Sequence, residues 1–221
     1  MIKALIFDFD GLILDTEVPE YQSWVELYQS YDCILPIEKW LECIGTTDAF
    51  NPYEELQEQL GRSIDREKIR LQRRARFAEL MADQPILPGV QDYIATAKQL
   101  GLKLGVASSS PREWVIGHLS RFSLDSNFDV ICCGDEVAVT KPDPALYLMA
   151  LQAMGIQAHE TIALEDSPNG ILAAKRAGIF VVAVPNALTR KLSLSVADFQ
   201  MNSLADLPLE QILQRACDAQ G

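Results

Sequence analysis

Short apolar runs separated by helical patterns are the most regular feature of this chain. Each run is too short for a helix and suits a strand that is buried on both faces. The runs are Lys3 to Phe7, Leu102 to Ala107, Asp129 to Cys133, Thr161 to Leu164 and Ile179 to Val184. The helical patterns between them are Val90 to Leu100, Arg112 to Phe122, Ala145 to Met154 and Gly170 to Ala177. This alternation predicts an α/β fold with a doubly wound parallel sheet and right-handed crossovers.

The stretch from residue 15 to residue 84 has a different pattern, with apolar positions at helical spacing and no strand-like run. These positions are Trp24, Leu27, Tyr28 and Tyr31, followed by Tyr53, Leu56 and Leu60. The stiff, proline-rich segment Pro85-Ile86-Leu87-Pro88-Gly89 then indicates a domain boundary. We therefore expect a Rossmann-like α/β core formed by residues 1–14 and 85–221, with a helical cap at residues 15–84 inserted after the first strand.

The composition is that of an ordinary globular protein, and the net charge limits its partners. The chain has 221 residues, of which 48% are hydrophobic and 23% charged. With 19 Lys plus Arg against 31 Asp plus Glu, the net charge is −12, which repels nucleic acid and anionic membrane surfaces. No apolar stretch approaches the roughly 20 residues that span a bilayer. We expect neither kind of partner, and a phosphate site here would need its own positive charge, such as a metal ion.

The N-terminus and the cysteines favour a cytoplasmic protein. The apolar start from Met1 to Phe7 meets Asp8 at once, whereas a signal peptide needs a longer apolar run and a cleavage site. The five cysteines are odd in number and show no C-x-x-C spacing. This favours free thiols in a reducing compartment over a disulfide framework.

Acidic pairs follow the first and the fourth apolar runs. Asp8 and Asp10 lie two residues apart in an extended chain, so both point to the same side and repel each other unless a cation or a proton intervenes. Glu165 and Asp166 follow the fourth run. A solvated turn at Gly11 and favourable charge at a helix start are the structural alternatives. Because ligands bind beyond the carboxyl ends of parallel strands, two facing acidic pairs would form a carboxylate site suited to Mg²⁺.

Hydroxyl groups and an ammonium group follow the second and third runs. The serines at positions 108–110 are candidates either for binding a phosphoryl oxygen or for capping the helix that Pro111 opens. Lys141 precedes a rigid turn, in which we expect Asp143 as the N-cap and Pro144 as the first helical residue. That turn would hold the ammonium as a fixed point charge. Together, the strand ends predict a site of acids, hydroxyls and one ammonium group.

These segments make the chain similar to members of the haloacid dehalogenase superfamily. The matching segments are Asp8-Phe9-Asp10-Gly11 with Asp15-Thr16, Val106-Ala107-Ser108, Lys141-Pro142, and Glu165-Asp166-Ser167 with Gly170. They occur in the order of the family's four motifs, and the helical insertion lies where the family places its cap. The chain most resembles the branch that contains phosphoglycolate phosphatase, small sugar-phosphate phosphatases and β-phosphoglucomutase.

The resemblance implies a Mg²⁺-dependent phosphatase that acts on a small phosphorylated metabolite. It implies that Asp8 attacks phosphorus and becomes an aspartyl-phosphate, and that Asp10 protonates the leaving oxygen and later activates water. The residues that would bind the transferring phosphoryl group are Ser108, Ser109 and Lys141. Those that would hold Mg²⁺ are Asp8, Asp10 through its backbone carbonyl, and Asp166. Glu165 would either bind the metal directly or lie behind these ligands.

The cap bears on the choice between a phosphatase and a phosphosugar mutase. β-Phosphoglucomutase adds a histidine in the first cap helix, where this chain has Glu20, and an arginine on a cap loop. The corresponding loop, Ile44 to Asp48, has no arginine. Both departures favour net hydrolysis, and acidic cap residues would favour a hydroxyl-rich sugar or polyol phosphate. The candidate substrate contacts are Glu17, Glu20, Thr46, Thr47 and Asp48.

Two further classes fit the residues less well. Dehalogenases of the superfamily attack carbon without a metal and lack the second acid of the first motif, which is Asp10 here. Response-regulator receivers, which are non-enzymatic phospho-acceptor modules, are shorter and lack the insertion. They carry the acceptor aspartate on the third strand, where this chain has Cys132 and Cys133. A phosphatase is therefore the expected function, with the mutase as the alternative.

Overall fold

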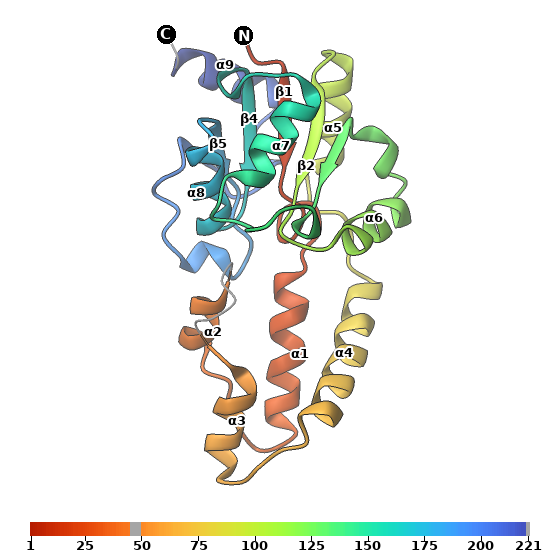
Figure 1. Cartoon of the computed structure of the whole chain (residues 1–221), viewed down its shortest axis with the longest axis vertical. Coiled ribbons are helices and arrows are strands. Elements are labelled where there is room, and N and C mark those ends of the chain that lie inside the picture. The colour runs from red at the N-terminus through yellow and green to blue at the C-terminus, as the bar shows by residue number, and fades with distance from the viewer. Residues whose placement is uncertain (45–49, 220–221) are drawn as a thin grey trace.

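The computed structural model describes residues 1–44 and 50–219, and within these residues a parallel sheet of six strands forms the centre (Figure 1). The strands are β1 (Ala4–Phe7), β2 (Lys103–Ala107), β3 (Val130–Cys132), β4 (Thr161–Glu165), β5 (Phe180–Ala183) and β6 (Phe199–Gln200). Their order is β3-β2-β1-β4-β5-β6, so the chain winds first to one side of β1 and then to the other. The doubly wound parallel sheet predicted from the sequence is confirmed. The pattern did not predict β6, because a strand of 2 residues is too short to show periodicity.

Strand β1 lies at the middle of the sheet and packs against helices on both faces. The core helices are α5 (Val90–Gln99), α6 (Arg112–Arg121), α7 (Ala145–Met154), α8 (Pro168–Arg176) and α9 (Leu209–Asp218). Short 3₁₀ turns lie at Asp125–Asn127, Gly134–Glu136, Ala158–Glu160 and Thr189–Lys191. Leu5 and Phe7 share an apolar cluster with α5, α6 and α9, whereas Ala4 and Ile6 share a second cluster with α7 and α8. Burial on both faces explains why β1 reads as a continuous apolar run.

Two helices begin one residue later than the sequence predicted. Helix α7 begins at Ala145, so Pro144 is its N-cap, and the carboxylate of Asp143 accepts a hydrogen bond from Ala145 N at 2.9 Å. Helix α6 begins at Arg112, because Pro111 before it has an extended backbone with ψ 149°. The serines at 108–110 do not cap α6: Arg112 N donates to Asp135 Oδ1 at 3.0 Å, and Ser108 and Ser110 donate to Asp10 instead.

The described residues between positions 15 and 84 form helices and loops without a strand. The helices are α1 (Glu17–Gln29), α2 (Ile37–Cys43), α3 (Pro52–Leu60) and α4 (Arg66–Ala82). Helices α1 and α4 lie side by side and extend away from the sheet (Figure 1). Trp24, Tyr28, Leu56 and Ile69 belong to an apolar cluster of this part, which also includes Leu188 from the core. The boundaries of cap and core at residues 14/15 and 84/85 stay a prediction.

The two chain segments that join cap and core are anchored close together. Leu14 and Ile86 form an isolated antiparallel bridge. On the return segment, the guanidinium of Arg121 in α6 donates to Met81 O at 2.8 Å and to Gln84 O at 2.5 Å. Helix α6 therefore holds the end of α4 and the segment that follows it.

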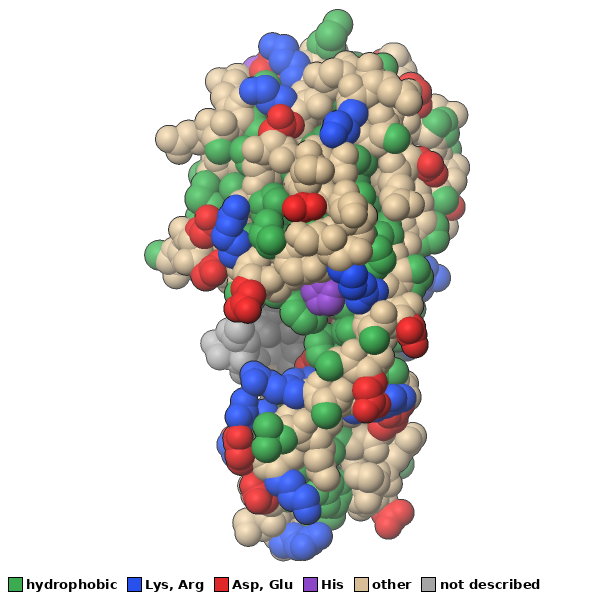
Figure 2. Space-filling model, turned by 90° about the vertical axis from the view of Figure 1, so that its right-hand side faces the viewer, with side chains coloured by type: hydrophobic (Ala, Val, Ile, Leu, Met, Phe, Trp, Pro, Cys, Tyr) green, Lys and Arg blue, Asp and Glu red, His purple; other side chains and the backbone are tan. Residues whose placement is uncertain are grey.

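Four of the six basic side chains of α4 are paired with acids. Arg70 contacts Glu67 at 2.5 Å, and Arg76 contacts Glu26 at 2.6 Å. Figure 2 shows blue basic and red acidic side chains intermixed over the lower, cap part of the molecule. Exposed pairs of this kind contribute little to stability, so they make a solvated surface rather than a stabilising core. None of the helices in the described part of the chain has both the length and the apolar character required to cross a membrane.

Candidate active site

A cavity of about 890 Å³ lies between the carboxyl ends of the strands and the cap helices. Side chains from the core that line it include Asp8, Asp10, Ser109, Ser110, Trp114, Lys141 and Asp166. Side chains from the cap that line it include Thr16, Glu17, Glu20, Ile44 and Phe77. The structure therefore brings together, around one space, sequence-predicted residues from four strand ends and from the first cap helix. The predicted contacts Thr46, Thr47 and Asp48 lie outside the described residues.

The loop after β1 places Asp8 at the edge of this cavity. Asp8 N donates to Leu164 O at 2.9 Å, which continues the parallel pairing of β1 with β4 by one residue. The chain then turns at Gly11, whose φ of +83° is a left-handed conformation that favours glycine. A Cβ atom on Gly11 would lie 2.3 Å from Asp166 Oδ2. Glycine thus lets the first motif approach the fourth closely.

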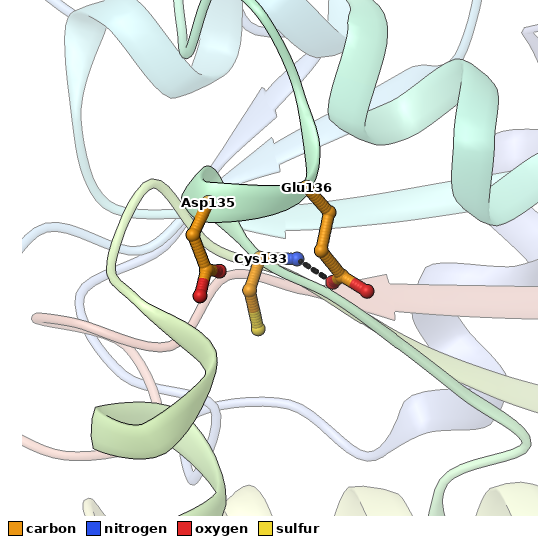
Figure 3. Close-up of side chains that lie close together, drawn as sticks. All are labelled: Cys133, Asp135 and Glu136. Carbon is orange, nitrogen blue, oxygen red and sulfur yellow. Dashed lines mark hydrogen bonds between the residues drawn. The ribbon is translucent and has the colours of Figure 1, made fainter.

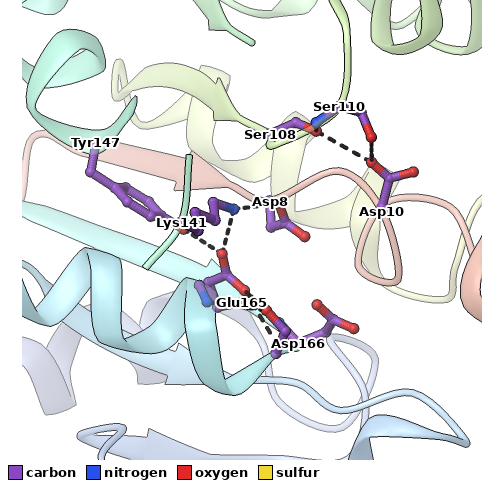
Figure 4. Close-up of polar contacts among 10 residues, drawn as sticks. Asp8, Asp10, Ser108, Ser110, Lys141, Tyr147, Glu165 and Asp166 are labelled. Carbon is purple, nitrogen blue, oxygen red and sulfur yellow. Dashed lines mark hydrogen bonds and ion pairs between the residues drawn. The ribbon is translucent and has the colours of Figure 1, made fainter. Parts of the chain in front are cut away.

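Three buried carboxylates lie close together, and two of them contact one buried ammonium group (Figure 4). Lys141 Nζ donates to Asp8 Oδ1 at 2.5 Å and to Glu165 Oε1 at 2.6 Å. One ligand oxygen from each of Asp8, Glu165 and Asp166 lies within 4.8 Å of the others. Asp8 is 6% exposed, Glu165 0% and Asp166 2%. Three carboxylates against one ammonium leave this buried cluster with excess negative charge when all are ionised.

The electrostatics of the cluster follow from burial and crowding. Burial raises the pKa of Asp8 to about 8, and repulsion from Glu165 adds to this effect. Burial, followed by repulsion from Asp8, also raises the pKa of Asp166 well above its usual range. For Lys141, burial acts to lower the pKa, but attraction to Asp8 and Glu165 outweighs it and the pKa is raised. The acids therefore resist ionising together unless a further cation joins them.

The donor set fits Mg²⁺, which prefers carboxylate and carbonyl oxygens. Glu165 is already occupied: Tyr147 donates to Oε1 at 2.7 Å, and Asp166 N donates to Oε2 at 3.1 Å. Asn186 Nδ2 donates to Asp166 Oδ2 at 2.8 Å. Within the part of the chain that the structure describes, Asp8 Oδ2 and Asp166 Oδ1 receive no side-chain hydrogen bond. These two oxygens are the ones best available to a metal ion.

Asp10 lies on the other side of Asp8 and accepts hydrogen bonds from three side chains (Figure 4). Ser110 Oγ donates to Asp10 Oδ2 at 2.7 Å and Ser108 Oγ donates to the same oxygen at 3.3 Å. Trp114 Nε1 donates to Asp10 Oδ1 at 2.9 Å. Of the predicted phosphate contacts, Ser109 is exposed and lines the cavity, whereas the buried Ser108 contacts Asp10.

The cap contributes two acids to the cavity, and they differ in surroundings. Burial raises the pKa of Glu17 to about 7, with repulsion from Asp10 as the next cause. Glu20 is instead paired with Arg73 of α4 at 2.5 Å. The guanidinium of Arg73 also lies over the Trp24 ring, 5.3 Å from its centroid. Arg73 thus offsets the charge of Glu20, whereas Glu17 is an acid of the cap wall with a raised pKa.

The family described as haloacid dehalogenase-like hydrolase matches residues 5–184. This span begins in β1 and ends just after β5, so it contains the acid cluster, Lys141 and Asp10. The chain belongs to this family.

Individual relatives of the haloacid dehalogenase-like chain agree in length and architecture. A protein of Bacillus subtilis (strain 168) named "Putative phosphatase YhcW" is 46% identical over 213 residues, covering 96% of this chain and 97% of the relative. A crystal structure of CbbY from Rhodobacter sphaeroides in complex with xylulose-(1,5)bisphosphate is 31% identical, with a TM-score of 0.72 and coverage of 94% and 96%. A crystal structure named "putative beta-phosphoglucomutase" from Thermotoga maritima is 25% identical, with a TM-score of 0.78 and coverage of 96% and 99%.

Sequence reasoning missed four side chains that hold the site residues of this haloacid dehalogenase-like enzyme. Tyr147 bonds Glu165, Asn186 bonds Asp166, Trp114 bonds Asp10 and Arg73 pairs with Glu20. Tyr147, Trp114 and Arg73 lie inside helices, where periodicity indicates a buried face but not the atom that is contacted. Asn186 follows β5, so the rule that ligands gather beyond strand ends was the one available signal for it.

A second group of potential metal ligands, one cysteine and two acids, lies near β3, but its two acids accept hydrogen bonds from nearby backbone N–H groups (Figure 3). One ligand atom from each of Cys133, Asp135 and Glu136 lies within 4.8 Å of the others. Glu136 Oε2 accepts a hydrogen bond from Cys133 N at 2.8 Å, and Asp135 Oδ1 accepts one from Arg112 N at 3.0 Å. Burial raises the pKa of the Cys133 thiol, which disfavours a metal-binding thiolate. These contacts stabilise the turn after β3 and the start of α6.

The raised pKa of Asp8 predicts how stability depends on pH. An unfolded aspartate loses its proton near about pH 4, whereas Asp8 in the metal-free fold keeps it up to about pH 8. The folded state therefore binds more protons between these values, and the free energy of unfolding should fall as pH rises from about 6.5 to about 8. Glu17, with its pKa also raised, acts in the same direction.

Urea denaturation at the two pH values, with and without saturating Mg²⁺, measures this dependence. Mg²⁺ favours the ionised acids, so it should reduce the fall in stability, and Asp8→Asn should reduce it without metal. A metal-free protein whose stability rises with pH over this range would contradict the account of the acid cluster.

Proposed function

We propose that this chain is a Mg²⁺-dependent phosphatase that hydrolyses a small sugar or polyol phosphate through an aspartyl-phosphate on Asp8. The observation that carries the proposal is the position of Asp8, which lines a cavity of about 890 Å³ with its Oδ1 2.5 Å from Lys141 Nζ. Membership in the haloacid dehalogenase-like hydrolases and the name of the Bacillus subtilis relative support phosphatase activity.

In the first step, Asp8 is the nucleophile. Its carboxylate oxygen attacks the phosphorus of the monoester, and an oxygen–phosphorus bond to Asp8 forms as the bond to the leaving oxygen breaks. The electron pair of the broken bond stays on the leaving oxygen, and Asp10 gives that oxygen its proton. The products are the free alcohol and the aspartyl-phosphate.

In the second step, water replaces Asp8 on phosphorus. Asp10, now ionised, takes a proton from the attacking water, and the oxygen of Asp8 leaves as a carboxylate. Inorganic phosphate departs, Asp8 is again a carboxylate, and Asp10 is again protonated because it has kept the proton taken from the water. The place of Asp10 in the cavity lining supports this assignment.

Positive charge around the phosphoryl group lowers the barrier of both steps. A loose phosphoryl-transfer transition state spreads negative charge over the equatorial oxygens, and fixed donors stabilise it. We assign this to the ammonium of Lys141 and to Ser109, while the buried Ser108 contributes through Asp10. Mg²⁺, held by Asp8, the backbone carbonyl of Asp10 and Asp166 with Glu165 behind them, would supply the remaining positive charge to the phosphoryl oxygens.

The cavity and the relatives favour a sugar or polyol as the alcohol part. A volume of about 890 Å³ lies in the range of small-molecule sites. The CbbY relative is bound to a sugar bisphosphate. On this chain, the carboxylate of Glu17 can accept hydrogen bonds from hydroxyl groups, and it disfavours a second phosphate near it. The free thiols of Cys132 and Cys133 suit a reducing compartment, so we place the reaction in the cytoplasm.

A screen of phosphorylated sugars and polyols with Mg²⁺, scored by released inorganic phosphate, tests the proposed function. We expect steady release from one or a few of these compounds and little from nucleotides. Absence of release from every monoester, including p-nitrophenyl phosphate, would overturn the proposal.

Mutase activity is the second candidate, because a solved relative carries the name of a β-phosphoglucomutase. A mutase must keep the aspartyl-phosphate from water until the sugar rebinds. The pairing of Glu20 with Arg73, at the position where that enzyme has a histidine, favours hydrolysis. Incubation with β-glucose 1-phosphate and a trace of glucose 1,6-bisphosphate decides between them. Faster formation of glucose 6-phosphate than of free phosphate would favour the mutase.

Replacement of Glu17 tests the contribution of the cap to substrate choice. We expect Glu17→Ala to raise the KM for the preferred sugar phosphate about 10-fold, because it removes a charge-assisted hydrogen bond to a hydroxyl. The rate with p-nitrophenyl phosphate, which has no hydroxyl, should change little. The exposed Glu67→Ala is the matched control on the cap surface. Equal losses with both substrates would exclude Glu17 as a specificity residue.

A further inference from the structure

Helix α6 is the core element that touches both the cap and Asp10. At one end, Trp114 donates its indole N–H to Asp10 Oδ1 at 2.9 Å. At the other end, Arg121 holds Met81 O and Gln84 O at the end of α4. Figure 1 shows α6 next to the end of α4 that faces the sheet. A single rigid helix thus spans from the cap to the side chain that we assign as the general acid and base.

The Trp114 ring is itself a contact between core and cap. It stacks on Phe77 of α4, with the ring centroids 5.8 Å apart and an angle of 19° between the planes. The His118 ring is a second neighbour, with its centroid 4.2 Å from that of Trp114 and an angle of 71° between the planes. Burial lowers the pKa of His118, which keeps this neighbour neutral near pH 7. The indole therefore contacts one ring of the cap and one ring of the core.

The bond to Trp114 determines where Asp10 Oδ1 points. Ser108 and Ser110 both donate to Oδ2 and come from the loop after β2, whereas Trp114 donates to Oδ1. Within the described residues, no other side chain donates to Oδ1. Rotation of the indole would leave that oxygen free to turn, since the bonds at Oδ2 fix one end of the carboxylate only.

We propose that Trp114 is a positioning residue that sets the orientation of the Asp10 carboxylate according to the place of the cap, because Phe77 of the cap holds the indole that Asp10 binds. The proposal rests on the proposed function for the chemistry of Asp10. When Phe77 of α4 packs on Trp114, the indole N–H of Trp114 holds Asp10 Oδ1 in place. When Phe77 leaves, the indole is released and Asp10 loses its alignment with the leaving oxygen. Proton transfer is thereby tied to the presence of the cap over the cavity.

The indole N–H gives a direct readout in ¹H–¹⁵N NMR spectra of the full chain. The three tryptophans give separate indole signals, and Trp114→Phe identifies that of Trp114. Asp10→Ala should shift this signal upfield, because the carboxylate acceptor is lost, and Phe77→Leu should move it as well. The signals of the other two tryptophans should stay in place. A Trp114 signal that neither variant moves would overturn the proposal.

Kinetics with two substrates separate positioning from simple packing. The leaving oxygen of an alkyl phosphate needs a proton, whereas that of p-nitrophenyl phosphate does not. A misplaced Asp10 should therefore slow the transfer of the phosphoryl group to Asp8 from the alkyl phosphate but not from p-nitrophenyl phosphate. General acid catalysis contributes about 10²–10⁴-fold, and loss of one of three donors should remove about 10-fold of it. We expect Trp114→Phe to show this loss with the alkyl phosphate in single-turnover experiments and to leave the p-nitrophenolate burst within about twofold.

Phe77→Leu should show the same selective loss, to a smaller extent, because Leu keeps the apolar volume without the stacked ring. Trp40→Phe is the matched control: the Nε1 of Trp40 is buried without a partner among the described residues, so this variant should not change the ratio of the two rates. Equal slowing of both substrates by Trp114→Phe would assign it a packing role and refute positioning.

The proposed function and the positioning role of Trp114 can be refuted separately. If the wild-type chain released no phosphate from either substrate, the proposed function would fall, while the NMR shifts would still decide whether cap and Asp10 are coupled through Trp114. If the wild type is active and the substrate ratio is unchanged in Trp114→Phe, the coupling is wrong and the phosphatase stands.

Discussion

Asp8→Asn is expected to abolish turnover while leaving the fold intact. The amide oxygen carries no negative charge and is a far weaker nucleophile than the carboxylate, so kcat/KM should fall by about four orders of magnitude or more. The amide oxygen can still accept the hydrogen bond from Lys141 Nζ, and the side-chain volume is nearly unchanged. Because the amide is neutral at a position where burial and crowding disfavour an ionised Asp8, the Tm without metal should not decrease.

Phosphate release and thermal unfolding of both proteins measure this result, and Asp92→Asn on the exposed first turn of α5 is the control. Acid quenching during turnover followed by mass spectrometry should locate a phosphoryl group on Asp8 in the wild type and none in the variant. Near-normal turnover of Asp8→Asn would mean that another group attacks phosphorus.

Lys141→Ala is expected to reduce both stability and activity. The side chain is 5% exposed and bonds Asp8 and Glu165, so its removal leaves three buried carboxylates without their cation. Breaking a buried ion pair in this way costs about 3–5 kcal/mol of unfolding free energy, less whatever protonation of the acids recovers. Loss of a fixed donor to the transition state should also lower kcat by about 10²–10³-fold.

Mg²⁺ distinguishes the two effects of this variant. Urea denaturation should show a larger stabilisation by Mg²⁺ in Lys141→Ala than in the wild type, because the metal replaces the missing positive charge. Activity should stay low, since the ammonium contact to the phosphoryl group is still absent. Lys175→Ala is the control: it breaks the half-exposed pair with Asp198 and should cost under about 1 kcal/mol. A metal-free Lys141→Ala protein as stable as the wild type would contradict this picture of the cluster.

The strand ends explain why much of the core site was predictable from the sequence. Asp8 directly follows the last residue of β1, and Asp166 directly follows the last residue of β4. The α/β alternation alone therefore brings both carboxylates to the same edge of the sheet. Lys141 was found in the same way, although it lies beyond the turn after β3 rather than at the strand end. The same alternation predicted the fold class. The apolar run of β1 is one part of that pattern, because β1 is buried on both faces.

The supporting contacts were not predictable, because they depend on how distant elements pack. Glu20 was taken as a substrate contact, and nothing near it in the sequence indicates that Arg73, 53 positions later, pairs with it. Trp114 reads as one apolar position of an amphipathic helix, and its bond to Asp10 appears only when α6 is placed beside the first loop. Periodicity identifies buried faces, whereas side-chain partners are set by tertiary geometry.

The bridge between Leu14 and Ile86 has a consequence for how such a chain can change over evolutionary time. The chain leaves the core at Leu14 and returns to it at Ile86, and these two residues are paired with each other. The ends of the insertion are therefore held together by the core itself. An insertion of another length would alter the entropy of closing that loop by only about 0.6 kcal/mol for each doubling. The helices between Leu14 and Ile86 could therefore lengthen, shorten or be exchanged with little effect on the strand ends that carry Asp8 and Asp166. Substrate choice and the attack of Asp8 on phosphorus would then be free to diverge at different rates within one gene, whereas exchange of Phe77 would be limited by its contact with Trp114.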